Sequence, residues 1–204
     1  MIKSTGRGPL IDHLDEIEER CLKGDLSLQE IFDIFGSDGH YVLITFLILP
    51  FLQPIPLLGL STPFGILIIS VSVLAYLKKP PWIPKKWAQK QVSAKTVSKI
   101  AEGSEKVFEK LTKILHPRLK FLFHGPLRTI NMISLVLNAF LLALPLPIPF
   151  SNTIPSWAIA LLALAHLEED GLFVILSHLA SIGCLVYFFS IAKGVEKGLG
   201  FFGI

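Results

Sequence analysis

Apolar and polar positions are segregated along this chain of 204 residues. Lys, Arg, Asp and Glu are absent from residues 41–77, 129–167 and 171–192. A helix needs about 20 apolar residues to cross a hydrocarbon core of about 30 Å. Residues 57–77 and 172–192 reach that length, whereas residues 41–52 do not. We therefore predict an all-α, polytopic integral membrane protein.

The apolar segments contain one unit that occurs twice. In each copy, an apolar segment is followed by a proline-rich break, small polar residues and a second apolar segment. The breaks are Pro54-Ile55-Pro56 with Ser61-Thr62-Pro63, and Pro147-Ile148-Pro149 with Asn152-Thr153-Ile154-Pro155. Paired breaks in the two halves of a membrane protein point to a binding site near the membrane midplane. We predict proline-broken or re-entrant helices in two related halves. The alternative is that the prolines only end short spans.

The cations are concentrated in the connector between the two copies. Of the 19 Lys and Arg residues, 13 lie between Lys78 and Arg128. Because Lys and Arg collect on the cytoplasmic side of membrane proteins, residues 85–128 are predicted to be cytoplasmic. The first copy ends in Lys78-Lys79 and the second in Glu168-Glu169-Asp170. That contrast favours inverted repeats, with the acidic end outside and residues 172–192 returning to the cytoplasm.

The polar regions are also expected to be helical. Residues 9–36 carry apolar side chains at helical spacing, and Ser27 with Glu30 predicts a capping box before the second of two short helices. This acidic region is expected to dock on the membrane domain or on a partner. Residues 88–115 combine a thin apolar stripe with lysines. That pattern fits either an interfacial helix on an anionic leaflet or a solvated linker.

The chain is therefore expected to have five parts. They are an amphipathic N-terminal region (1–40), a first membrane repeat (41–84), a basic cytoplasmic or interfacial connector (85–128), a second membrane repeat with the final span (129–192) and a tail (193–204). The N-terminus is polar, so we expect no cleavable signal peptide and expect the membrane segments to direct insertion. Cys21 and Cys184 are far apart in sequence and are predicted to be free thiols.

A series of short motifs runs through the chain in order. The motifs are Leu49-Pro50, Pro54-Ile55-Pro56, Gly59-Leu60-Ser61-Thr62, Pro81-Trp82-Ile83-Pro84, His116-Pro117-Arg118, Pro147-Ile148-Pro149-Phe150 with Asn152 and Pro155, and Glu169-Asp170-Gly171. Together they resemble the ExoD family of bacterial membrane proteins over roughly residues 10–192. The family is associated with exopolysaccharide synthesis. The resemblance therefore implies a bacterial inner-membrane protein of envelope polysaccharide production, but it supplies no reaction.

One position departs from that family pattern. Ahead of Pro81-Trp82, such proteins tend to carry a glycine and arginines, where this chain has Lys78-Lys79-Pro80. Lysine keeps a positive charge at that position. It cannot form the bidentate hydrogen bonds of an arginine guanidinium group.

The residue types that perform chemistry show no arrangement for catalysis. Ser61, Thr62 and His40 lack a local group that would orient them, so we expect that the protein is not an enzyme. The histidines show no metal-ligand spacing, so no metal and no other cofactor is predicted. Nucleic-acid binding is not expected, because the basic stretch adjoins membrane anchors and lacks interleaved aromatic residues.

Small polar residues beside the breaks form the candidate substrate site. Pro63 and Pro155 would stand in the first turn of a helix, with Thr62 and Asn152-Thr153 as caps. Helix N-termini attract anions. The predicted substrate-binding residues are Pro54, Pro56, Ser61, Thr62, Pro63, Pro147, Pro149, Asn152, Thr153 and Pro155, together with the connector arginines Arg118 and Arg128.

The acidic triplet gives a second candidate site. Glu169 and Asp170 could reach back toward the breaks and bind a coupling ion or a proton. The alternative is an interfacial turn that only marks a membrane boundary.

The predicted function is non-enzymatic: the protein binds or moves an anionic, lipid-linked substrate such as a polyprenyl phosphate. One alternative is a scaffold or regulator of a polysaccharide synthase or export complex. Another is a small-ion or proton-coupled transporter. The expected partners are membrane lipids, a polyprenyl-phosphate-linked substrate, polysaccharide synthesis proteins and a second copy in a homodimer.

Overall fold

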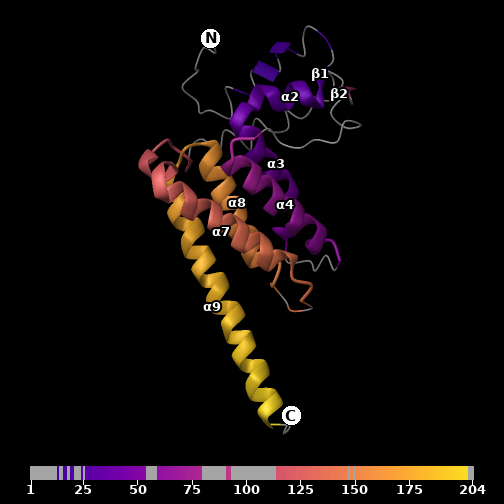
Figure 1. Ribbon diagram of the computed structural model, residues 1–204, viewed down its shortest axis with the longest axis vertical. Coiled ribbons are helices and arrows are strands. Elements are labelled where there is room, and N and C mark those ends of the chain that lie inside the picture. The colour runs from indigo at the N-terminus through magenta and orange to yellow at the C-terminus, as the bar shows by residue number, and fades with distance from the viewer. Residues whose placement is uncertain are drawn as a thin grey trace.

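The computed structural model is dominated by helices (Figure 1). It describes residues 13, 16–17, 19–20, 24, 26–53, 59–79, 91–92, 114–146, 148 and 150–201. A bundle is formed by α3 (Gly39–Ile48), α4 (Ser61–Tyr76), α7 (Gly125–Ala143) and α8 (Thr153–Leu167). The longest helix, α9 (Gly171–Phe201), packs against α8 and then runs on beyond the bundle toward the C-terminus. The predicted helical class is confirmed.

Shorter elements surround the bundle. α2 (Leu28–Phe35) is followed by the 3-10 turn η1 (Gly36–Asp38), while η2 (Leu49–Phe51) extends α3 and η3 (Lys120–Phe123) precedes α7. The two-residue strands β1 (Leu26–Ser27) and β2 (Gln91–Val92) pair antiparallel, which the periodicity did not predict. Within 88–115, only residues 91–92 and 114–115 are described, so the helical prediction for that stretch lies outside the described residues.

The predicted capping box is present at the start of α2. The backbone N–H and the hydroxyl of Ser27 both donate to Glu30 Oε2, at 2.8 and 2.7 Å, and the Glu30 N–H donates to Ser27 Oγ at 3.2 Å. The bonds from Ser27, the backbone one foremost, lower the pKa of Glu30, because they stabilise its ionised carboxylate. N–H groups that a helix start leaves unpaired are satisfied in this way.

The bundle helices contact one another in a ring. α3 packs on α4 and α8, and α7 packs on the same two helices. α4 and α7 run antiparallel. The Thr62 hydroxyl, at the start of α4, donates to Ala143 O at the end of α7 (2.8 Å). Arg128, near the start of α7, donates to Ala75 O and Tyr76 O at the end of α4 (3.2 and 2.7 Å).

The corresponding helices of the two halves, α3 and α7, run in the same direction. α3 is antiparallel to α4, since His40 at the start of α3 hydrogen-bonds through Nε2 to Lys79 O just after α4 (2.9 Å). α8 ends beside the start of α3, where Tyr41 stacks on His166 with ring centroids 4.3 Å apart. Inverted repeats would make α3 and α7 run in opposite directions. The structure thus differs from the inverted repeats predicted above, because the first helices of the two halves are parallel.

This direction defines two ends of the bundle. The basic end carries Lys78, Lys79, Arg118, Arg128 and the turn Glu168–Asp170, and the opposite end, called the break end, carries the described break residues Ser61–Pro63 and Asn152–Pro155. The sequence reasoning put the acidic turn outside, opposite the lysines, because their charges differ. Opposite charges share one end here because they form ion pairs there.

The bundle core is apolar and closely packed. Fully buried side chains come from every bundle helix and from η2: Ile44, Ile48, Phe51, Ile68, Leu142, Ile159 and Leu162. Gly65 brings α4 close to α7, because a Cβ there would lie 2.7 Å from Ala139 O and 2.8 Å from Ala143 Cβ. Close contact through small residues is typical of helix packing in membranes.

The helix lengths only partly match the predicted spans. α7 and the Gly171–Gly194 part of α9 are long and apolar enough to cross a membrane. α3 with η2, α4 and α8 are apolar but shorter, at 10–17 residues. Residues 57–77 do not form one long span, because α4 begins only at Ser61 and ends at Tyr76. By length and composition, the two long helices fit a membrane protein.

Candidate functional site

The predicted site residues divide between the two ends of the bundle. Ser61, Thr62, Pro63, Asn152, Thr153 and Pro155 lie at the break end, and Arg118, Arg128, Glu169 and Asp170 lie at the basic end. The 15-residue helix α8 separates the two groups by about 22 Å, at 1.5 Å per residue. Pro54, Pro56, Pro147 and Pro149 lie outside the described residues. The structure therefore does not join the acidic turn to the described break residues.

At the break end, each half provides a hydroxyl to the other. Thr62 Oγ1 donates to the carbonyl oxygen of Ala143, the last residue of α7 in the second half (2.8 Å). Thr153 Oγ1 donates to Gln53 O, just past η2 in the first half (3.2 Å). Carbonyl groups at the end of a helix lack a partner within it. The two threonines satisfy such groups across the two halves.

The same contacts correct the predicted caps. Neither α4 nor α8 has a side-chain hydrogen bond at its N-cap, which is Leu60 in α4 and Asn152 in α8. The threonine hydroxyls that were expected to cap these helices bind the opposite half instead. Pro63 and Pro155 do stand in the first turns, as predicted.

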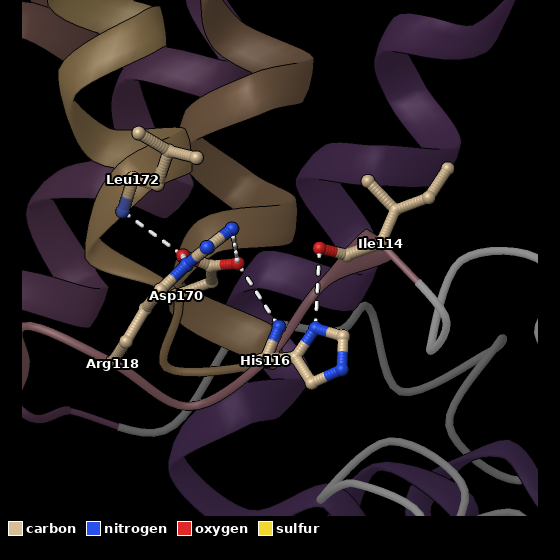
Figure 2. A network of polar contacts seen from close by, with 5 residues as sticks. All are labelled: Ile114, His116, Arg118, Asp170 and Leu172. Carbon is tan, nitrogen blue, oxygen red and sulfur yellow. Dashed lines mark hydrogen bonds and ion pairs between the residues drawn. The ribbon is translucent and has the colours of Figure 1, made fainter.

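At the basic end, the Asp170 carboxylate is the centre of a polar network (Figure 2). Arg118 donates to it through Nε and Nη2, to Oδ1 at 2.8 Å and to Oδ2 at 3.1 Å. The backbone N–H of His116 donates to Oδ2 (3.0 Å) and that of Leu172 to Oδ1 (2.9 Å). Asp170 is fully buried, at 0 % exposure. The network ties the chain before η3 to the start of α9.

The balance of burial and hydrogen bonding keeps Asp170 ionised. Burial raises its pKa, but the bonds from Arg118, His116 and Leu172 outweigh that effect and hold the pKa below its ordinary value. The same bond to Asp170 raises the pKa of Arg118. A carboxylate has about four acceptor positions, and four donors occupy them here. Asp170 therefore offers no free oxygen to a coupling ion in this conformation.

Backbone hydrogen bonds reinforce this join. The Arg118 N–H donates to Glu169 O (3.2 Å), and the Gly171 N–H donates to Arg118 O (2.8 Å). Gly171 has no space for a side chain, since a Cβ would lie 2.6 Å from Leu119 Cβ. Glu169 forms a separate ion pair with Lys120, and both side chains are about half exposed.

A cavity of about 820 Å³ lies at the basic end. Its lining includes the cations Lys78, Lys79 and Arg128 and residues at the starts of α3 and α7, among them His40 and Gly125. The other charged or aromatic lining residues are Asp33, Asp38, Tyr41, Phe123, His124, His166 and Glu169. Cavities of about 300–1,000 Å³ are typical of small-molecule sites. Of the predicted site residues that the structure describes, only Arg128 and Glu169 line it.

Comparison with known proteins places the chain in a family. The family model described as "Exopolysaccharide synthesis, ExoD" matches residues 10–190. The chain belongs to the ExoD family. It is 36% identical over 166 residues to Protein ExoD of Rhizobium meliloti (strain 1021), which covers 80% of this chain and 69% of that protein. It is 28% identical over 162 residues to the uncharacterized protein slr1875 of Synechocystis sp., covering 77% of this chain and 76% of that one. No solved structure matches it with comparable significance.

The sequence reasoning missed most of the cavity in this ExoD-family chain. Lys78 and Lys79 were considered only as the basic end of the first repeat, where they depart from the family pattern, and not as part of a site. His40 and His166 come from different halves, 126 positions apart in the chain. No local pattern predicts that such residues meet. One signal in the sequence could have identified Lys78 and Lys79 as site residues. They stand at the end of the first repeat, and in parallel repeats that position lies beside the end of the second repeat.

A chain of polar side chains also runs through the interior between α7 and α9. Ser134 and Ser181 share a hydrogen bond between their hydroxyls (3.1 Å), and Asn138 Nδ2 donates to Ser181 Oγ (2.7 Å). Asn131 Oδ1 lies 3.0 Å from His178 Nε2. Asn138 is 1% exposed, and its Oδ1 has no hydrogen-bond partner among the residues that the structure describes. Hydrogen bonds of this kind hold apolar helices together in membranes.

Proposed function

We propose that this protein is a membrane protein of exopolysaccharide production that binds an anionic, lipid-linked substrate, such as a polyprenyl phosphate, in the cavity at the basic end. Its role is binding rather than catalysis. Family membership supports the pathway. The cavity with its cations, at one end of an apolar bundle, supports the substrate class.

Membrane insertion is supported by the outward faces of the helices. Large apolar side chains such as Ile133, Phe140 and Leu179 are more than half exposed, at 56%, 53% and 58%. Contiguous exposed apolar surface is costly in water, and hydrocarbon would cover it. In the bacterial inner membrane, the concentration of lysines in the connector sequence supports a cytoplasmic location for the basic end.

The charges around the cavity favour an anion. Among the described residues, Lys78 and Lys79 make no ion pair. Three acids also line the cavity: Glu169 pairs with Lys120, Asp38 contacts His13, and Asp33 accepts a hydrogen bond from Gln29 but keeps its charge. The starts of α3 and α7 add the positive ends of two helix dipoles. A phosphate group is suited to such a site, with its lipid chain entering the surrounding membrane.

The test is binding of polyprenyl phosphate to the purified protein in lipid nanodiscs. The double variant Lys78→Gln/Lys79→Gln should bind about 30-fold more weakly, since each lysine near a membrane surface contributes about 1 kcal/mol toward an anion. Lys193→Gln is the control for each single lysine, because it makes the same Lys-to-Gln change in the exposed far part of α9. Folded wild-type protein that fails to bind polyprenyl phosphate would refute the proposal.

A small-ion or proton path is a second candidate function, and the interior polar chain favours it. The orphan Asn138 Oδ1 could accept a hydrogen bond from a passing water or hydronium ion. Proteoliposomes should then show proton flux without any lipid substrate, and Asn138→Leu should abolish it. Equal flux in protein-free liposomes would remove this candidate.

A further inference from the structure

The break end exposes apolar side chains and carries no charge. Leu49, Leu60 and Phe150 are 48%, 50% and 57% exposed there. Residues 41–77 and 129–167, which contain both breaks, include no Lys, Arg, Asp or Glu. Loops that face water are normally rich in polar residues, because they lie on the surface. The break end therefore has the composition of a surface in contact with hydrocarbon.

The length of the apolar part of α9 indicates how far the hydrocarbon core extends past the break end. Its apolar part, Gly171–Gly194, has 24 residues and is about 36 Å long, whereas α8 has 15 residues and is about 22 Å long. α9 continues past the break end without a bundle helix beside it (Figure 1). Val186 and Phe189 in this part of α9 are 60% and 66% exposed. If the membrane ended at the breaks, these side chains would face water.

We infer that the two helical hairpins, α3–α4 and α7–α8, enter the membrane from the basic end and turn back inside it, and that α9 alone crosses to the other side. The break end is then a contact surface for the acyl chains of the far leaflet. Lys193 lies across the membrane from Lys120. This inference rests on the membrane insertion stated under the proposed function, but not on the substrate.

The hydrogen bonds at the breaks fit this depth. Irregular backbone is tolerated inside a membrane only where its polar groups find protein partners. Besides the two threonines that join the halves, Ser151 Oγ donates to Leu146 O (3.2 Å) and Ser156 Oγ donates to Asn152 O (2.6 Å). These hydroxyls supply donors where water would supply them outside a membrane.

Each hairpin also contains a helix that is too short for a full crossing, although α7, with 19 residues, is long enough by itself. α3 with η2 covers Gly39–Phe51, or about 20 Å, and α8 about 22 Å, against a hydrocarbon core of about 30 Å. Either helix would leave roughly a third of the core uncrossed. Re-entrant hairpins remove the mismatch, since their turns can stop at any depth.

The inference predicts a distinct pattern of thiol labelling in intact cells. Single cysteines are placed by Lys120→Cys, Phe150→Cys and Lys193→Cys in a Cys21→Ser background, where the buried Cys184 serves as an unreactive internal control. An impermeant maleimide added outside should label the cysteine at 193. It should label the one at 120 only after the cells are opened, and the one at 150 in neither case.

Two results would overturn the inference. Labelling at 150 from outside would mean that the hairpins cross the membrane, and labelling at 193 only in opened cells would mean that α9 does not. A nitroxide spin label attached at position 150 in reconstituted protein tests whether the lack of maleimide labelling there is due to burial in hydrocarbon. It should collide with oxygen far more often than with a water-soluble nickel complex, and the reverse ratio would also overturn the inference. Failure to bind polyprenyl phosphate would leave all of these results unchanged.

Discussion

At the basic end, polar groups are satisfied by charge. One buried carboxylate, Asp170, collects four donors, and the segments that it joins lie 52 or more residues apart in the chain. At the break end, the segments that the structure describes contain no Lys, Arg, Asp or Glu, and the neutral hydroxyls of Thr62 and Thr153 donate to backbone carbonyls. Hydrogen bonds to charged groups are stronger than those between neutral groups, but charged groups are favourable only near water. A break inside hydrocarbon must use neutral donors, because an ion there is expensive.

The largest expected effect comes from removing the charge at the centre of the basic end. In Asp170→Asn, an amide NH₂ group replaces one carboxylate oxygen. The four hydrogen bonds can then not all be accepted, because the NH₂ group is itself a donor and faces donors. Breaking a buried charge pair costs about 3 kcal/mol or more, so the free energy of unfolding should fall by that amount. Glu169→Gln is the matched control next to it. Its exposed pair with Lys120 should cost less than about 1 kcal/mol. Equal losses in both variants, measured by thermal unfolding in detergent, would contradict this prediction.

The same carboxylate predicts loss of stability in acid. The pKa of Asp170 is lower in the folded protein than its ordinary value of about 3.9 in the unfolded chain. Its contribution is therefore complete above about pH 4 and is lost as the pH falls through the folded-state pKa. Unfolding midpoints measured down to about pH 2 should drop less steeply in Asp170→Asn than in the wild type. Parallel curves would show that other groups govern acid unfolding.

A smaller effect is expected where α4 meets α7 near the break end. Gly65→Ala places a Cβ against Ala139 O and Ala143 Cβ, so the helices must separate. Overpacking of this kind costs about 1–3 kcal/mol. Gly183→Ala is the control, because a Cβ at that position in α9 meets nothing within 4 Å. Unfolding by denaturant in mixed micelles should distinguish the two, and a neutral Gly65→Ala would show that the contact is looser than the structure indicates.

The smallest effect compares the two threonines directly. Thr62→Val and Thr153→Val each remove one hydroxyl and leave a carbonyl without its donor, at a cost of about 1 kcal/mol within a membrane. The bond from Thr62 is shorter, at 2.8 Å against 3.2 Å, so its loss should cost more. The double variant should lose the sum of the two, since the bonds share no atom. A strongly non-additive loss would show that the breaks form one cooperative unit.

Local patterns predicted the parts of this fold that depend on neighbours in the sequence. The capping box of Ser27 and Glu30 needs only a spacing of three residues, and it is present. The place of Pro63 and Pro155 in first turns follows from the missing N–H of proline. The apolar runs predicted helices, although α4 proved shorter than its run.

The direction of the repeats and the contents of the candidate site depend on partners that sequence spacing does not reveal. The acidic turn was assigned to the far side because charge sign was used to infer side, whereas Arg118 and Lys120 neutralise it on the same side. Asp170 and Arg118 were both singled out, but their pairing was not predicted. The cavity joins His40 to His166 through packing between halves, which no motif encodes.

The hydroxyls of Thr62 and Thr153 make the two halves of the chain dependent on each other. Each half carries a donor that the other half uses, so a single half on its own would leave a carbonyl and a hydroxyl without these partners. The two donors are not equivalent in sequence, since Thr62 directly precedes Pro63, whereas Thr153 stands two residues before Pro155. The second contact is therefore not a copy of the first. A change that removes either hydroxyl loosens both halves, although only one of them carries the substitution.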